Sequence, residues 1–422
     1  MRDVPQTPMD VETAAPSDSA PQAEPEREPT GPGRTHWLRV ARETADDLAT
    51  DAVARDQAAK PPFDEVSRLR ESGLLSLLVP AGSGGGGADW ATAYAVVREI
   101  AAADAAVAQL LGTHYFVSWS ARLLTGPSAA AELERRSAAE QWCWGGGFAR
   151  QDPPLILART AGGQRLEGRQ SYVTGVLVAD RIAVRAVRAG TGEPLAVAVD
   201  PARHGVAVDA QDDPFGQRLA AGGGVEFASV AVTADDVLGS LSAEEDVLSP
   251  MASLASPLGR LMSVQLRLGL AEGVLAEARE YSRAGRRPWQ PEWPAGSPQD
   301  PHVLAAYGEL TVLTRSASAL AGQALEALQG GLARGDDLGY EECAEISALA
   351  AVAEVAASTA VRESTTRALD VIGPRSASAR LGLDRFWRNA RAHTLYEPVA
   401  PRLRDVGDYY LNGTHPPFTL PV

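Results

Sequence analysis

The chain has 422 residues, of which 45% are hydrophobic and 22% are charged, and its formal net charge is −15. This composition is typical of a globular protein with one to three domains, and the negative charge argues against nucleic acid or an anionic membrane surface as the main partner. Only Cys143 and Cys343 are present, without a CxxC pair, so no disulfide framework and no metal site is predicted. Because neither an apolar N-terminal targeting segment nor an apolar run of about 20 residues occurs, we expect a cytoplasmic protein without a membrane span.

The N-terminal third divides into a tail and a helical domain. Residues 1–36 contain seven prolines among acidic and small polar residues, and such a segment cannot bury enough apolar surface to offset its chain entropy. We therefore predict a disordered tail. From 37 to 140, apolar residues recur at helical spacing in three stretches, which predicts an N-terminal helical domain.

The remaining residues change from a strand pattern to a helical one. Residues 141–240 hold short runs rich in Val and Ala, such as RIAVRAV and VEFASVAV, separated by Gly, Pro and Asp, and these predict antiparallel strands. Residues 241–422 contain four long Ala-rich amphipathic stretches with short Gly and Pro breaks, which predicts an up-and-down four-helix bundle. The apolar face of these helices is too broad for one chain to cover, so we expect a homo-oligomer.

The segment DRFWRNARAHTLYEP near the C-terminus carries the strongest candidate for proton chemistry. His393 and Glu397 are four residues apart, so a continuous helix would place them on one face. An imidazole beside a carboxylate is suited to proton transfer, and three nearby arginines could hold an anion: Arg385, Arg388 and Arg391. An ion-paired helix end without a catalytic role is the alternative.

Several short motifs occur in a characteristic order along most of the chain. They are SGLLSLLVP (72–80), VVREIAAAD (96–104), GTH (112–114), YVTG (172–175), VIGPR (371–375) and DRFWRNARAHTL (384–395). Together with the order of helices, strands and helices, they resemble the acyl-CoA dehydrogenase fold, and most closely its dibenzothiophene monooxygenase branch. The resemblance implies a mainly α protein with a β insert: an N-terminal helical domain, a middle antiparallel β-barrel-like domain and a C-terminal four-helix bundle.

The activity implied by this resemblance is that of a two-component flavin-dependent monooxygenase. Such an enzyme takes FMNH2 from a separate flavin reductase, forms a flavin hydroperoxide with O2 and oxygenates a small organic substrate, commonly as a homotetramer. His393 matches the histidine that stabilises or protonates the peroxide, and Thr174 matches a hydroxyl residue beside the flavin N5. His114 is the candidate for a second pocket histidine, with a structural core histidine as the alternative.

Further residues match cofactor and substrate positions of the family. Arg287, Gly373 and Arg375 match positions at the flavin phosphate, with Arg287 reaching across a subunit boundary, and guanidinium groups pair with phosphate at two points. The aromatic residues Trp142, Trp144 and Phe148 match a segment beside the flavin and the substrate, although core packing explains them equally well.

The sequence also departs from the branch. Glycines at 145–147 replace polar side chains, and the segment 212–224 is short and lacks a tryptophan, so dibenzothiophene itself is in doubt as the substrate.

Two other functions are compatible with the sequence. An acyl-CoA dehydrogenase with FAD would use Glu397 as the base that abstracts a proton, because Tyr396 and Glu397 fall where dehydrogenases carry a YEG motif. Pro398 replaces the glycine of that motif, which weakens this alternative. A catalytically idle scaffold or flavin carrier is the third hypothesis.

Overall fold

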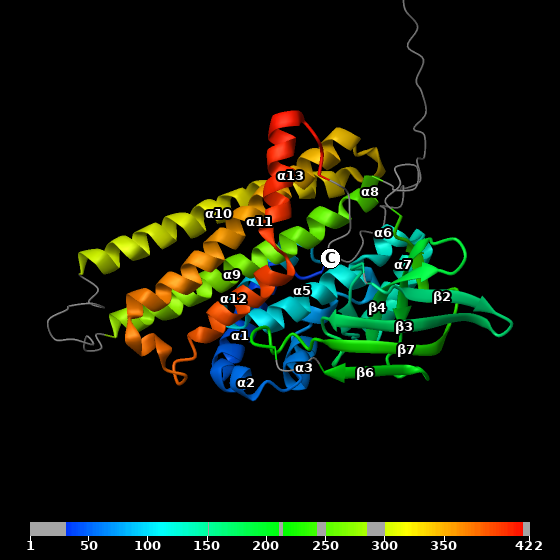
Figure 1. Cartoon of the computed structure of the whole chain (residues 1–422), viewed down its shortest axis with the longest axis horizontal. Helices are drawn as coiled ribbons and strands as arrows, with labels where there is room; N and C mark the ends of the chain where they lie inside the picture. The colour runs from blue at the N-terminus through cyan, green and yellow to red at the C-terminus, as the bar shows by residue number, and fades with distance from the viewer. Residues whose placement is uncertain (1–30, 151, 211–213, 243–249, 285–299, 417–422) are drawn as a thin grey trace, which may run out of the picture.

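The computed structural model describes residues 31–150, 152–210, 214–242, 250–284 and 300–416 (Figure 1). The described chain begins with helices that precede the sheet in sequence. The first helix starts at Arg34, so the last three residues of the segment predicted to be disordered are helical. The helices are α1 (Arg34–Ala49), α2 (Ala52–Ala58), α3 (Phe63–Glu71), α4 (Trp90–Ala103), α5 (Ala105–Trp119), α6 (Ala121–Leu124) and α7 (Pro127–Ala139).

Capping aspartates define where α4 and α5 begin. The Asp89 carboxylate accepts a hydrogen bond of 2.8 Å from the backbone N–H of Thr92. The Asp104 carboxylate accepts from the N–H groups of Ala106 and Val107, each at 3.1 Å. These bonds satisfy donors that have no partner inside a helix, and they place the kink between α4 and α5 at Asp104.

Eight strands form one sheet with the order β6-β7-β3-β2-β4-β5-β8, and β1 pairs with β4. Most pairs are antiparallel, as predicted, but β4 pairs in parallel with β1 and with β2, which the sequence pattern did not indicate. A parallel pair needs a crossover connection, and local alternation of apolar residues carries no information about it. The strands are β1 (Trp144–Gly146), β2 (Leu155–Thr160), β3 (Gly163–Val173), β4 (Arg181–Arg188), β5 (Pro194–Val199), β6 (Val206–Ala210), β7 (Gly223–Val232) and β8 (Val237–Ser240).

Long helices return after the sheet. Three of them, α9 (Ala255–Arg283), α10 (Pro301–Arg334) and α11 (Tyr340–Ile372), pack side by side, and α11 contacts both of the others (Figure 1). The predicted fourth helix is divided into α12 (Asp384–Tyr396) and α13 (Val399–Asn412), with Glu397 and Pro398 at the break, and a short α8 (Pro250–Ser253) precedes α9. By length and composition α11 could cross a membrane, but 67% of its apolar window is buried, as in a core helix of a bundle.

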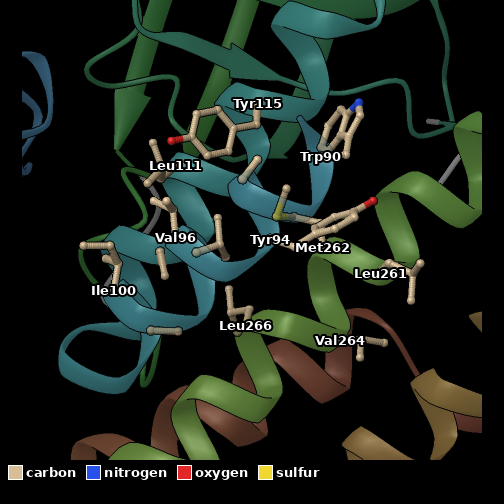
Figure 2. Packing of buried hydrophobic residues seen from close by; sticks show 14 of the residues in the cluster. Trp90, Tyr94, Val96, Ile100, Leu111, Tyr115, Leu261, Met262, Val264 and Leu266 are labelled. Carbon is tan, nitrogen blue, oxygen red and sulfur yellow. The ribbon is translucent and has the colours of Figure 1, made fainter. Parts of the chain in front are cut away.

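The main core lies between α4, α5 and α9. Figure 2 shows Trp90, Tyr94, Met262 and Leu266 in this interface. The Tyr94 hydroxyl donates to the Leu258 carbonyl at 2.9 Å, which joins α4 to α9. At Gly112 on α5, a Cβ would lie 2.8 Å from Cγ of Met262, so glycine permits the close approach of α5 to α9. The predicted domain boundaries after 140 and after 240 fall in the links between elements and stay predictions.

Candidate active site

A cavity of about 620 Å³ lies where α5, α9 and α12 meet the end of β3 and the loop 214–222. In Figure 1, α5 runs between the long helices and the sheet, so the cavity sits at the junction of both parts. Its apolar wall includes Phe116, Phe148, Leu177, Met262 and Leu266. Its polar wall includes Gln109, Thr113, Gln170, Thr174, Gln217, Arg218, Ser263, His393 and Glu397.

His393 is placed in the cavity wall by α12. The buried face of this helix includes Phe386, Asn389, Ala390 and His393, which recur at helical spacing. His393 is only 6% exposed. Burial, followed by the positive charge of Arg267, holds the pKa of His393 well below its ordinary value of 6.5. The imidazole is therefore neutral at neutral pH.

A buried arginine on α9 joins His393 to Glu397. Nε of Arg267 donates to Nδ1 of His393 at 3.2 Å, and Nη2 donates to Oε2 of Glu397 at 2.5 Å. The Ser263 hydroxyl donates to Oε1 of Glu397 at 2.9 Å. Sequence reasoning missed Arg267, although a charged residue inside the apolar run LMSVQLRLGL was a signal for a buried polar contact.

Thr174 lies directly after β3 and is held by backbone contacts on both sides. Its carbonyl accepts from the Gly146 N–H at 2.8 Å, and the next N–H, of Gly175, donates to the Ala220 carbonyl at 2.9 Å. Gln109 on α5 donates through Nε2 to the Thr174 hydroxyl at 3.4 Å. The strand and the helix thus bring a hydroxyl and an amide together at one point of the cavity wall.

Three glutamine side chains in the cavity wall have buried oxygen atoms without hydrogen-bond partners in the described part of the chain. The Oε1 atoms of Gln109, Gln170 and Gln217 are buried and have no hydrogen-bond partner among the residues that the structure describes. All three residues line the cavity. Because a buried acceptor without a partner costs about 1–3 kcal/mol, these oxygens suit a bound molecule or water that carries N–H or O–H donors.

Comparison with known proteins assigns the chain to a family. Two family models match: Acyl-CoA dehydrogenase, N-terminal domain, over residues 36–127, and Acyl-CoA dehydrogenase, C-terminal domain, over residues 261–401. The dibenzothiophene monooxygenase of Mycolicibacterium goodii is 35% identical over 392 residues, which cover 90% of this chain and 94% of the relative. The chain belongs to the flavin-dependent monooxygenase branch of the acyl-CoA dehydrogenase family.

Two further relatives of this monooxygenase agree with the assignment. The probable FMNH2-dependent monooxygenase SfnC of Pseudomonas putida is 34% identical, with 90% of this chain and 95% of the relative covered. The crystal structure of FMN-bound TdsC from Paenibacillus sp. A11-2 matches with a TM-score of 0.86 at 32% identity, covering 91% of this chain and 99% of TdsC. The predicted fold class and the predicted monooxygenase activity are thereby confirmed.

The candidate for a second pocket histidine lies elsewhere in the monooxygenase. His114 is 1% exposed and does not line the cavity. Its Nδ1 accepts from the Trp144 N–H at 3.0 Å, and its Nε2 lies 2.6 Å from the Leu75 carbonyl, to which it must donate. Burial lowers the pKa of His114 to about 4. These contacts match the structural alternative for His114, whose role remains a prediction, and Gln109 lines the cavity from the same helix.

Only one of the three predicted pocket aromatics of the monooxygenase lines the cavity. Trp144 is 1% exposed and donates through Nε1 to the Ser137 hydroxyl at 2.9 Å. Trp142 stacks under the Arg181 guanidinium, 3.8 Å from the ring centroid. Both indoles belong to the core behind β1, whereas Phe148 reaches the cavity. Trp144 thus contacts α7 through Ser137, and Trp142 lies between Arg136 of α7 and Arg181 of β4.

Of the residues predicted at the phosphate of the cofactor, the two that the structure describes do not line the cavity. Arg287 lies outside the described residues. Gly373 and Arg375 lie at the end of α11 and in the turn Pro374–Ala377, and neither lines the cavity. Arg375 is exposed. Their roles remain predictions.

Two of the three arginines of α12 are paired with acidic partners. Arg385 pairs with Glu277, and Arg388 pairs with Asp56 and with Asp384. Arg391 contacts Thr394 at 3.5 Å. These pairs anchor α12 to α9 and to α2 and engage Arg385 and Arg388, and the anion-binding role of the three arginines remains a prediction.

Close packing of the backbone explains why glycine occupies positions 145 and 146. Gly146 has φ +107°, and a Cβ there would lie 2.0 Å from the Ala183 carbonyl on β4. A Cβ on Gly145 would lie 2.9 Å from the Gly175 backbone. The close approach of β1 to β4 and to the Thr174 segment therefore excludes side chains at both positions.

Proposed function

We propose that the monooxygenase binds reduced FMN in the cavity between α5, α9, α12 and the sheet, and that it oxygenates a small organic substrate there with O2. The observation that carries this proposal is the convergence of His393, Thr174 and Gln109 on one cavity. Reduced FMN supplies the electrons that activate O2. The protein residues bind the reactants, orient them and exclude water.

The cavity fits a flavin in chemistry as well as in size. A tricyclic ring needs apolar walls, which Phe148, Met262 and Leu266 supply. Its polar edge and ribityl chain carry N–H and O–H groups that can satisfy the orphaned glutamine oxygens. Arg218 is the only arginine or lysine among the described residues that line the cavity, so we expect Arg287 and Arg375 to complete the phosphate site from another subunit.

His393 and Thr174 are proposed to flank the reacting atoms. Each side chain accepts a hydrogen bond from a neighbouring residue, His393 from Arg267 and Thr174 from Gln109. A polar group held by the fold needs no reorganisation during the reaction, and hydrogen bonds aimed at a developing charge are worth most where water is excluded. We therefore expect His393 to stabilise an oxygen atom held in the cavity.

The acyl-CoA dehydrogenase alternative fits the site less well. A base that removes a carbon-bound proton needs a carboxylate free to accept it. The Glu397 carboxylate instead accepts from Arg267 at 2.5 Å and from Ser263 at 2.9 Å, so both of its oxygens are engaged.

Replacing Glu397 with glutamine tests the two functions against each other. We expect oxygenation to fall by less than about 10-fold, because the amide oxygen can still accept from Arg267. The wild-type protein should show no acyl-CoA oxidation with an artificial electron acceptor. Oxidation of an acyl-CoA by the wild type, abolished in the variant, would establish the dehydrogenase instead.

A separate flavin reductase is proposed as the partner that supplies FMNH2. The test is to add chemically reduced FMN and 18O2 without any reductase, and to search by mass spectrometry for a product that contains one labelled oxygen atom. Indole and dibenzothiophene are suitable first substrates, because TdsC has been crystallised with indole and several relatives are named for dibenzothiophene. Label in the product supports the proposal, and binding of neither FMN nor FAD would favour the idle scaffold.

We further propose a cytoplasmic homotetramer. The support is a set of exposed apolar side chains on α10 and α13, where one chain leaves the helices uncovered. They include Val312, Leu403, Tyr410 and Leu411, which are 66%, 55%, 91% and 78% exposed. Static light scattering of the purified protein measures the assembly directly.

A further inference from the structure

The hydrogen bond between Arg267 and His393 determines which nitrogen of the imidazole carries the proton. A guanidinium group can only donate, so Nδ1 of His393, 3.2 Å from Nε of Arg267, is the acceptor. A neutral imidazole has one N–H, which must then be on Nε2. No hydrogen-bond partner of Nε2 occurs among the described residues, and His393 lines the cavity.

We infer that Arg267 is a positioning residue that fixes His393 as the Nε2–H tautomer, so that the imidazole presents a hydrogen-bond donor to the cavity. With the opposite tautomer, Nε2 would be an acceptor and would repel the lone pairs of an oxygen atom in the cavity. Arg267 thus determines whether His393 donates or accepts a hydrogen bond in the cavity, although Arg267 itself does not line the cavity.

Arg267 is held by partners from two other elements. Its side chain is fully buried on α9, at 0% exposure. Besides Glu397, its guanidinium contacts two residues of α11, the Ser358 hydroxyl at 2.8 Å and Glu354 at 3.5 Å. A planar guanidinium group that has partners on several sides has little freedom to rotate, so its Nε–H stays directed at His393.

The charges around His393 disfavour its protonation. Burial and Arg267 both oppose a second positive charge, while Glu397 is neutralised by the same guanidinium. The ionisable groups that surround this network are Arg260 on α9, Glu354 on α11, and Arg402 and Asp405 on α13. Of the two roles expected for His393, stabilisation by a hydrogen bond is therefore favoured over donation of a proton.

The first test measures His393 in the flavin-free protein, so it does not depend on the proposed function. Deuterium exchange at the imidazole carbon between the two nitrogens, followed by mass spectrometry, gives the pKa of each histidine. In Arg267→Met we expect the pKa of His393 to rise by about one unit or more, because a positive neighbour is removed and Glu397 is left unpaired. Arg260→Met removes another buried arginine of α9 and should leave the pKa of His393 near its wild-type value. An unchanged pKa in Arg267→Met overturns the inference.

The second test rests on the proposed function and uses reduced FMN, O2 and a substrate. Arg267→Met should increase hydrogen peroxide release per turnover several-fold, and Arg267→Lys, which retains a donor, should recover part of the coupling. In an Arg267→Met/His393→Ala double variant, the loss of coupling between oxygen consumption and product formation should not exceed the loss in His393→Ala alone. Additive losses would mean that Arg267 acts independently of His393. Wild-type protein that yields no labelled product would instead count against the proposed function.

Discussion

Replacement of His393 by alanine is expected to lower product formation by about 100-fold and to increase hydrogen peroxide release correspondingly. The reason is the loss of one preorganised hydrogen-bond donor from the cavity wall, an interaction of the kind that contributes about 10²–10³ to the rate in other enzymes. The measurement is the ratio of product to hydrogen peroxide with chemically reduced FMN and O2.

His393→Gln provides the matched control, because its amide N–H keeps a donor of similar reach. This variant should retain more coupling than His393→Ala. Circular dichroism and a thermal unfolding curve check that both variants fold. Wild-type coupling in a folded His393→Ala protein would remove His393 from the mechanism.

The second large effect concerns stability and comes from His114. The pKa of this residue is about 4 in the folded protein because of burial, against 6.5 for an unperturbed histidine. As the pH falls, His114 is therefore protonated in the unfolded chain before it is protonated in the folded protein. His114 does not affect the free energy of unfolding above about pH 6.5, and it lowers that free energy progressively between pH 6.5 and about pH 4. Over that window we expect the free energy of unfolding to drop by about 3 kcal/mol from this residue.

Urea denaturation at several pH values measures this effect. His114→Gln, which cannot titrate, should show a shallower decline than the wild type between pH 6.5 and pH 4, whatever its stability at neutral pH. The difference between the two slopes isolates His114, because the remaining ionisable groups are shared. Parallel slopes would show that His114 is protonated to the same extent in the folded and unfolded states.

The order of elements and the position of His393 could be predicted because both are encoded locally. The spacing of apolar residues changes between the helical and the strand period where the chain changes between helices and strands. The buried face of α12 likewise follows from the helical spacing of its apolar residues. The break after Tyr396 was less evident, so Glu397 was expected on the same helix as His393 and instead lies just beyond it.

The positions of Gln109 and His114 show what the sequence left open on α5. The two residues are five positions apart on α5, which places them about 140° apart around the helix axis. Apolar residues surround this helix on all sides, so no polar face indicated which side meets the cavity. The sequence left His114 open between a pocket role and a core role, and the packing of α5 brings Gln109 rather than His114 to the cavity wall.

Arg267 could not be assigned to the site for a different reason. Its partner His393 is 126 residues further along the chain, and their contact depends on how α9 packs against α12. A single sequence gives the helical face of each residue but not the register between two helices. The charge inside an apolar helix indicated a buried partner without identifying it.

The most direct measurement is a crystal structure of the protein with FMN bound. We expect the isoalloxazine ring in the cavity between α9 and β3, with Nε2 of His393 and the Thr174 hydroxyl facing its reactive edge and with glutamine oxygens of the cavity wall satisfied by the cofactor or by ordered water. A flavin bound outside this cavity, or a ring whose reactive edge points away from His393, would contradict the proposed site.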